Sequence, residues 1–280
     1  MENIYLPNLA EIMGIKQETP DIKTFKLKFK DPAVENSFSY KPGQFVEFTV
    51  PEEGEAPFCI SNSPTRNSGS TGAGIECSVK KMGKVTQALH ELNTGDIVGI
   101  SGPYGNGFPV EELKNKNLLF VAGGIGLAPL RSLLNYCLDN RGDFKSITIV
   151  NGARTSKDLV YKDEYKVWEK AKDTRLYLTV DCQEENWSCM VGVVPRILET
   201  IKPTCNNAAA IVCGPPIMIK FTIPVLLKIG FCPEEIITTL EMKMKCGLGK
   251  CGRCNIGHKY ICKDGPVFSF AQLEGLNYEH

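Results

Sequence analysis

Residues 118–134 read LLFVAGGIGLAPLRSLL, and this stretch decides the fold of half the chain. An apolar run leads into glycines at positions 123, 124 and 126, and a helical pattern follows them. Glycine lets such a turn tighten and lets a phosphate approach backbone N–H groups at the helix N-terminus. Gly123, Gly124, Gly126 and Pro129 form the pattern GGxGxxP, in which Pro129 replaces the third glycine of the dinucleotide fingerprint. The stretch predicts a nucleotide site, with a ligand-free glycine turn as the alternative.

Further apolar runs follow this turn and alternate with helical patterns. The runs are SITIVNGAR (146–154), LYLTVD (176–181) and AAAIVCGPP (208–216), and the helical stretches are KDEYKVWEKA (162–171) and VPRILETI (194–201). Nearly continuous apolar strands that alternate with helices indicate a parallel, helix-covered sheet.

Ligands of such sheets lie beyond the carboxyl ends of the strands. Cys213 and Gly214 end one apolar strand, Pro215 opens the next helix, which also holds Met218, and Arg154 follows another strand. We therefore expect these residues at the edge that carries the glycine turn. Arg154 is placed to meet a ribose or phosphate, and a solvated surface arginine is the equally weighted alternative.

The first 110 residues have a different pattern. DIKTFKLKFK (21–30), GQFVEFTV (43–50), GIECSVKKM (74–82) and DIVGISGPYG (96–105) read as strands, and Gly and Pro punctuate them at short intervals. This indicates an antiparallel barrel. We expect a barrel domain over 1–110, a parallel-sheet α/β domain over 111–235, and a small cysteine-rich segment over 236–280.

The composition limits the class of protein. The chain has 280 residues, of which 32 are Lys or Arg and 32 are Asp or Glu, so nothing points to nucleic acid or an anionic membrane. The apolar runs are too short to span a bilayer, and the N-terminus lacks the pattern of a signal peptide. Twelve cysteines without an export signal fit a reducing cytoplasm. We expect a cytoplasmic protein.

Four of the cysteines lie within CGLGKCGRCNIGHKYIC (246–262). Cys246, Cys251, Cys254 and Cys262 follow the spacing C-x4-C-x2-C-x7-C, and the first three match the plant-type motif of a [2Fe–2S] cluster. Structural zinc is the main rival, although zinc ribbons more often show two C-x2-C pairs. A disulfide pair is a poor third in a cytosolic protein.

Two motifs in the barrel half carry a resemblance. APFCISNSP (56–64) is similar to the R-x-Y-S/T flavin segment of the ferredoxin–NADP reductase superfamily, and GKVT (83–86) is similar to its G-x-x-S/T segment. The resemblance places Phe58 at the aromatic position and Cys59 at the hydroxyl position, while Ala56 replaces the arginine. It also places GPYGNGF (102–108) at the link between domains, and it implies FAD as the cofactor.

The cysteine segment after the nucleotide domain resembles a narrower group of electron-transfer proteins. This group includes the corresponding subunit of anaerobic sulfite reductase, the gamma subunits of sulfhydrogenases and the electron-transfer subunit of dihydroorotate dehydrogenase B, and the short gap before Cys262 is closer to the first two. The resemblance implies that NAD(P)H passes a hydride to flavin N5 near Cys59. Electrons then leave singly through the cluster to a catalytic redox subunit that docks near it, and the flow can also run in reverse.

The expected site residues follow from the motifs and the resemblance together. Cys59 and Cys213 are the catalytic candidates, although Cys59 can also be read as a reactive thiol and Cys213 as a core thiol. The expected cofactor contacts are Phe58, Cys59, Ile60, Ser61, Gly83, Lys84, Val85, Thr86, Gly123, Gly124, Gly126, Pro129, Arg154, Gly214, Pro215 and Met218.

Two other functions remain open at this point. The chain can be a non-catalytic flavin and iron–sulfur relay subunit of a larger or electron-bifurcating complex whose nicotinamide site is unused, which the missing arginine at Ala56 would fit. It can also be a zinc-stabilised flavoprotein that reduces free ferric or flavin substrates. The sequence does not choose between NADH and NADPH.

Overall fold

The N-terminal region is an antiparallel barrel. The computed structural model describes residues 6–66 and 74–276. Six strands form one sheet in the order β4-β3-β6-β1-β2-β5. They are β1 (Asn8–Thr19), β2 (Ile22–Phe29), β3 (Phe45–Val50), β4 (Gly54–Cys59), β5 (Ile75–Lys80) and β6 (Ile97–Tyr104), with short helices α1 (Pro32–Ser37) and α2 (Lys84–Glu91). The sheet curls until its two outer strands meet, because the Ser61 N–H after β4 donates to the Glu76 carbonyl on β5 at 2.8 Å.

The alternation of side chains along β3 explains how the barrel is packed. Val46, Phe48 and Val50 are buried in the barrel core. The alternate residues Phe45 and Glu47 point to the other face of the strand, where Phe45 packs into a different apolar cluster. This second face is covered by the C-terminal part of the chain, so β3 is buried on both sides.

The second region is a seven-stranded sheet in the order β10-β9-β8-β7-β11-β12-β15. Its strands are β7 (Asn117–Gly123), β8 (Ile147–Ala153), β9 (Thr174–Val180), β10 (Met190–Val191), β11 (Ala208–Cys213), β12 (Ile236–Thr239) and β15 (Val267–Ser269). The helices are α3 (Val110–Leu113), α4 (Leu127–Asp139), α5 (Tyr165–Lys170), α6 (Val194–Ile201) and α7 (Pro216–Ile229). One apolar core joins the sheet to α4 and α5, and another joins its opposite face to α6 and α7. All strands are parallel except β15, which runs antiparallel to β12.

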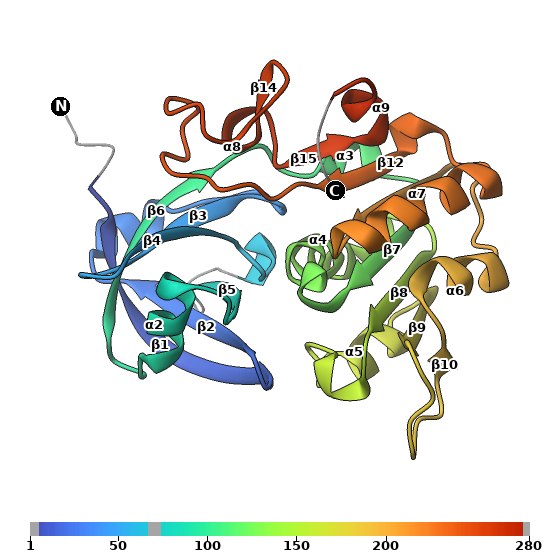
Figure 1. Cartoon of the computed structure of the whole chain (residues 1–280), viewed down its shortest axis with the longest axis horizontal. Helices are drawn as coiled ribbons and strands as arrows, with labels where there is room; N and C mark the ends of the chain where they lie inside the picture. Colours follow the sequence, from blue (N-terminus) through green and yellow to red (C-terminus); the bar gives the residue numbers. More distant parts are fainter. Residues whose placement is uncertain (1–5, 67–73, 277–280) are drawn as a thin grey trace.

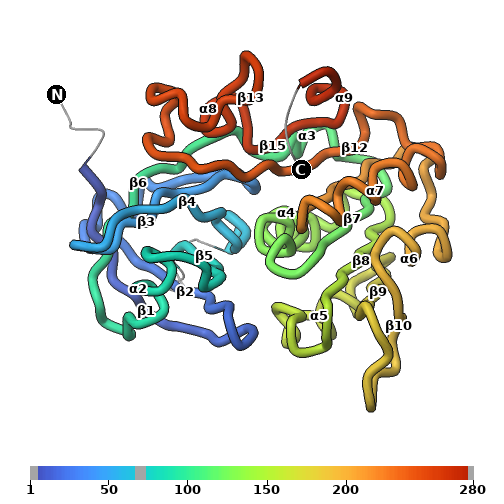
Figure 2. Tube along the Cα trace, viewed as in Figure 1, coloured from blue at the N-terminus to red at the C-terminus, as the bar shows by residue number. Residues whose placement is uncertain are grey.

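The C-terminal segment connects the two regions. It holds β13 (Asn255–Ile256), β14 (Lys259–Tyr260), α8 (Ile261–Asp264) and α9 (Phe270–Leu273). Its apolar cluster includes Phe45 of β3, while β15 pairs with β12 of the parallel sheet. Figures 1 and 2 show this segment, in red, lying over both regions.

The predicted fold class is confirmed: an antiparallel barrel precedes a parallel, helix-covered sheet and a small C-terminal lobe. β12 begins at Ile236, the first residue of the expected cysteine segment, so the parallel sheet continues into that segment. None of the helices within 6–66 and 74–276 is long and apolar enough to cross a membrane.

Candidate functional site

The predicted nucleotide turn lies at the carboxyl end of β7. Gly123 ends this strand, Gly124–Gly126 form a single 3-10 turn, and α4 begins at Leu127. A Cβ atom at Gly126 would lie 2.5 Å from the Cys213 carbonyl oxygen, so only glycine lets the two turns touch. A Cβ atom at Gly124 would meet nothing within 4 Å, so the turn opens to free space at that residue.

The second predicted turn joins β11 to α7 and packs against the first. A Cβ atom at Gly123 would lie 2.5 Å from the Met218 sulfur and 3.0 Å from Pro215, and one at Gly214 would lie 2.5 Å from the Met218 methyl. Gly123, Gly126, Gly214, Pro215 and Met218 therefore lie together at one edge of the sheet.

The other nucleotide residues lie near that edge in different settings. Pro129 is buried in the first turn of α4, so it shapes the helix start. Arg154 is exposed just beyond β8, at the same end of the parallel sheet as the glycine turns. The structure brings the predicted edge together, with Arg154 at its exposed side.

The predicted flavin strand is β4. Phe58 and Cys59 are half-buried, and the Phe58 ring meets Phe48 edge-on at 6.0 Å between ring centroids. Ile60 and Ser61 have no exposed surface, and the Ser61 hydroxyl donates to the Glu76 carbonyl at 3.0 Å. Phe58 and Cys59 thus keep surface for a ligand, while the Ser61 side chain already serves barrel closure.

The predicted phosphate turn lies at the start of α2. The Thr86 hydroxyl accepts the N–H groups of Met82 and Gly83, each at 2.8 Å, and donates to the Gly83 carbonyl at 2.9 Å. A Cβ atom at Gly54, the first residue of β4, would lie 3.4 Å from the Val85 side chain. The turn holding Gly83, Lys84, Val85 and Thr86 therefore lies beside β4.

The two catalytic candidates, Cys59 of β4 and Cys213 of β11, both pack at one apolar cluster. Burial raises the pKa of Cys59 well above its usual value, and charges at Cys77, Glu241 and Cys213 add to this. Burial likewise raises the pKa of Cys213 to about 12, although the Thr239 hydroxyl, which donates to its sulfur at 3.0 Å, lowers it. Both thiols therefore stay protonated at neutral pH, which suits weak donors better than nucleophiles.

Glu241 acts on both thiols, and the sequence did not predict it as a site residue. It follows β12 by two residues and influences the pKa of both Cys59 and Cys213. Its side chain reaches solvent, yet the surrounding protein raises its pKa by displacing water. Its position after a strand of the parallel sheet was the signal, because ligands lie beyond those strand ends.

The cysteine loop is built around sulfur acceptors. The Cys246 sulfur accepts backbone N–H groups from Leu248, Lys250 and Cys251 at 3.3–3.4 Å. Burial raises the pKa of Cys246, but these N–H donors outweigh it and lower the pKa to about 7. Donors of this kind favour a thiolate, the form that binds a metal.

A second set of contacts closes the loop around Cys262. The Gly249 N–H donates to the Cys262 sulfur at 3.1 Å, and Gly249 has a φ of +70°, which glycine adopts without strain. Burial and then the neighbouring Cys254 thiol raise the pKa of Cys262 to about 12. Cys254 and Cys262 are buried, and Cys251 is exposed.

The four thiols form two pairs. Cys246 interacts with Cys251, and Cys262 interacts with Cys254. In the part of the chain that the structure describes, no three Cys, His, Asp or Glu side chains converge as ligands of a single metal ion. Two pairs of cysteine thiols with backbone N–H donors nearby fit an iron–sulfur cluster, since a two-iron cluster takes two protein ligands on each iron.

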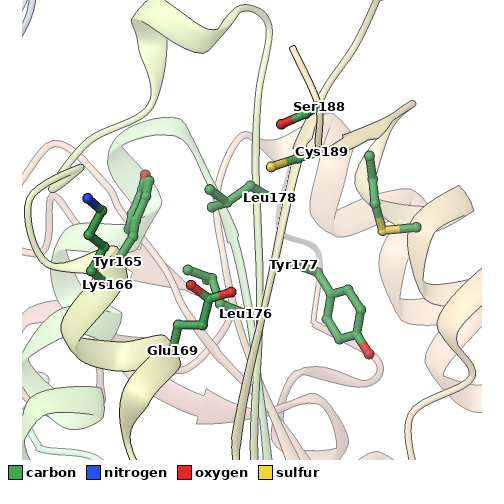
Figure 3. A pocket seen from close by; sticks show the side chains of 9 residues that line it. Tyr165, Lys166, Glu169, Leu176, Tyr177, Leu178, Ser188 and Cys189 are labelled. Carbon is green, nitrogen blue, oxygen red and sulfur yellow. The ribbon is translucent and has the colours of Figure 1, made fainter.

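A pocket lies away from these residues, at the far side of the parallel sheet. Figure 3 shows it between α5, β9 and the start of β10. Its lining residues are Tyr165, Lys166, Glu169, Leu176, Tyr177, Leu178, Ser188, Cys189 and Met190. No predicted site residue lines it.

Three protein-family models match the chain in the order of its regions. Residues 10–108 match the oxidoreductase FAD-binding domain, and residues 120–223 match the oxidoreductase NAD-binding domain. Residues 241–274 match the iron-sulfur cluster binding domain of dihydroorotate dehydrogenase B. The chain therefore has FAD-binding, NAD-binding and iron–sulfur-binding domains.

Relatives match over nearly the whole chain. Sulfhydrogenase 1 subunit gamma of Pyrococcus furiosus is 39% identical over 97% of this chain and 94% of its own. A probable dihydroorotate dehydrogenase B electron transfer subunit of Methanocaldococcus jannaschii is 33% identical over 94% and 89%. The solved structure of an NADH-dependent reduced ferredoxin-NADP oxidoreductase, described for flavin-based electron bifurcation, aligns with TM-score 0.77 and 27% identity over 99% and 92%. The chain therefore belongs to the electron-transfer subunits of the ferredoxin–NADP reductase superfamily that carry an iron–sulfur domain.

Proposed function

We propose that the chain passes electrons between NAD(P)H, FAD and a [2Fe–2S] cluster, and from there to or from the catalytic subunit of a redox enzyme. The observation that carries this proposal is the loop of four paired thiols packed on the outer face of the flavin barrel. Bound flavin accepts a hydride and releases its electrons singly, which a one-electron cluster can relay.

Each part of the chain has a role in this scheme. Gly124 and the start of α4 hold the nucleotide phosphates, and Arg154 contacts its ribose or phosphate. Phe58 packs on the flavin ring, and the protonated Cys59 thiol lies near its reacting nitrogen. Thr86 fixes the turn whose free N–H groups bind the flavin phosphates. This contact compensates for Ala56, which stands where the family has a phosphate-binding arginine.

Cys213 and Glu241 border the place where nicotinamide and flavin meet. Both act on Cys59, although Cys213 follows β11 and Glu241 follows β12. Cys213 excludes water and donates weakly, and Glu241 is the polar group at the mouth of this interface. We propose the regions 1–110, 111–235 and 236–280 as the flavin, nucleotide and cluster parts.

The partner subunit docks where the cluster comes nearest to solvent. Cys251 is exposed, whereas Cys254 and Cys262 are buried. Residues 242–263 contain six Lys or Arg and no Asp or Glu, in a chain whose formal net charge is zero. This local positive charge favours a partner with an acidic face. The relatives named as subunits of sulfhydrogenase and dihydroorotate dehydrogenase B support a catalytic partner subunit. We propose that the two act in the cytoplasm.

Anaerobic reduction of the purified chain tests the proposal. The visible spectrum is recorded before and after NADH or NADPH, with assays for iron and acid-labile sulfide. We expect about two irons and two sulfides per chain, and bleaching of flavin and cluster bands by one nucleotide. Cys251→Ser should lose the cluster and keep the flavin, and Cys232→Ser, at an exposed thiol outside the loop, should lose neither.

Two other results would favour one of the alternative functions. Zinc without sulfide would mean that the four cysteines are a structural staple. A loaded flavin and cluster that neither nucleotide reduces would identify a relay subunit with an unused nicotinamide site.

A further inference from the structure

Glu47 is a buried carboxylate without a partner. It lies in the middle of β3 with 3% of its surface exposed. Neither carboxylate oxygen has a hydrogen-bond partner among the described residues. Burying a charged group without a partner is costly, so such a residue calls for a physical reason.

Glu47 lies between the flavin strand and the cysteine loop. On β3 it is directly opposite Pro57 of β4, the residue before Phe58. Its side chain is on the outer face of the barrel, away from the core that holds Val46 and Phe48. The charges of Cys246 and Lys245 act on it from the cysteine loop. An electron that moves from flavin to cluster therefore passes close to this carboxyl group.

The surroundings of Glu47 do not neutralise a negative charge. From β4 it is faced by the acidic Glu55, and from β6 by Tyr104, whose hydroxyl hydrogen-bonds with Ser101. Lys245 is the cation that acts on it, and it is exposed and forms no ion pair among the described residues.

These surroundings favour the neutral acid. Burial, then the charges of Glu55 and Cys246, raise the pKa of Glu47 to about 7, and Lys245 opposes them. The carboxyl group is thus poised so that one more negative charge nearby shifts it toward the protonated form.

We propose that Glu47 takes up one proton when one electron reaches the iron–sulfur cluster. The inference rests on the proposed function, because it needs a cluster held by Cys246. The electron comes from reduced flavin and the proton from solvent or from the flavin that is being oxidised. The cluster gains one negative charge, the Glu47 carboxylate becomes a carboxylic acid, and the local charge is unchanged. No bond other than the new O–H bond of Glu47 is formed.

The sign of the pH dependence follows from this exchange. At low pH Glu47 is protonated before and after reduction, so the midpoint potential of the cluster does not change with pH. Between the pKa of Glu47 with the cluster oxidised and its higher pKa with the cluster reduced, reduction requires proton uptake and becomes harder as pH rises. When one proton is taken up with each electron, a rise of one pH unit shifts the reduction equilibrium tenfold. The midpoint potential of the cluster then falls by about 59 mV per pH unit.

The test is an anaerobic redox titration of the full chain with its cofactors, followed by electron paramagnetic resonance of the reduced cluster at several pH values. We expect the wild-type potential to fall as pH rises above neutrality and the potential of Glu47→Gln to stay flat. Glu55→Gln is the matched control, because it removes a nearby but exposed carboxylate, and it should keep the slope. Iron, sulfide and flavin contents are measured for each variant.

A second measurement uses the wild-type protein alone. Reduced-minus-oxidised infrared difference spectra should gain a protonated carboxyl band on reduction, and this band should be missing from Glu47→Gln if that variant folds. A cluster-loaded wild type whose potential is independent of pH and whose spectrum gains no such band would overturn the role of Glu47 and leave the electron-transfer function standing. A chain without iron and sulfide would overturn both.

Discussion

The flavin barrel buries carboxylates at two of its interfaces, and it treats them in opposite ways. Toward the parallel sheet, the Glu18 side chain is 3% exposed and has three partners: it accepts from the Tyr161 N–H at 2.9 Å and the Thr24 hydroxyl at 3.1 Å, and it pairs with Lys16. Toward the cysteine loop, Glu47 is also buried, and it has no hydrogen-bond partner among the described residues. The first interface is built to stay fixed, and the second holds a group whose charge can change.

Arg131 is a second buried charged group with several partners at the interface between the barrel and the parallel sheet. It extends from α4 to the barrel and pairs with Glu76 at 2.7 Å and with Glu164 at 2.6 Å. Its guanidinium also donates to the Ser61 carbonyl and lies over the Tyr161 ring at 4.7 Å. A buried cation with this many partners holds the barrel and the nucleotide region in one geometry.

The largest effect should come from breaking that fixed interface. Arg131→Met leaves the Glu76 and Glu164 carboxylates, which are 24% and 17% exposed, without their shared cation. We expect a loss of about 3–5 kcal/mol in the free energy of unfolding, because removing one partner strands the other charges. Urea unfolding of the anaerobic protein measures this loss. Arg131→Lys keeps the charge without the fork and should lose less; equal losses would show that the pairing geometry is unimportant.

A matched pair of substitutions sharpens the comparison. Burial first raises the pKa of Glu47 to about 7, above its unfolded value, so the unfolded state ionises at lower pH than the folded state. Stability is therefore lost as pH rises from the unfolded pKa through the folded one, and the full cost is present above both. Glu47→Gln should relieve about 2–3 kcal/mol at alkaline pH and much less in mild acid.

The same change at Glu18 should have the opposite sign. Glu18→Gln weakens three charge-assisted contacts and should destabilise the protein by about 1–3 kcal/mol. Thermal unfolding of both variants at mildly acidic and alkaline pH measures the two effects. A Glu47→Gln variant that is less stable than wild type at alkaline pH would mean that Glu47 has a partner in the folded protein.

Local signals predicted the fold and most of the proposed site. The GGIGLAP turn comes at the end of an apolar run, so the strand, turn and helix could be read from residues 118–134 alone. The spacing of the four cysteines likewise predicts an iron–sulfur cluster from a single short segment. A tight turn requires glycine at fixed intervals, and a metal cluster requires cysteine at fixed intervals. Both signals therefore occur within short stretches of the sequence.

Long-range burial could not be read in this way. Along FVEFTV the period-two pattern puts Glu47 on the polar face of its strand, so it reads as solvated. The structure covers that face with the cysteine loop, about 200 residues later in the chain. Arg131 also reads as a surface residue of an amphipathic helix, yet it lies between Glu76 of the barrel and Glu164 of its own region. The positions of Glu241 and of the antiparallel strand β15 also depend on how the C-terminal segment folds back over both regions.

The smallest effect should come from an exposed ion pair at the fixed interface. Arg66 pairs with Asp139 through two nitrogens at 2.8–3.2 Å, but their side chains are 40% and 28% exposed. Water screens such a pair, so Arg66→Ala should cost less than about 1 kcal/mol and the cost should fall further in high salt. Urea unfolding at low and high salt measures it beside Arg131→Met. If Arg66→Ala and Arg131→Met lost equal stability, burial would not explain the strength of an ion pair in this protein. The contrast between the interface at Glu18 and the interface at Glu47 would then rest on pairing geometry alone.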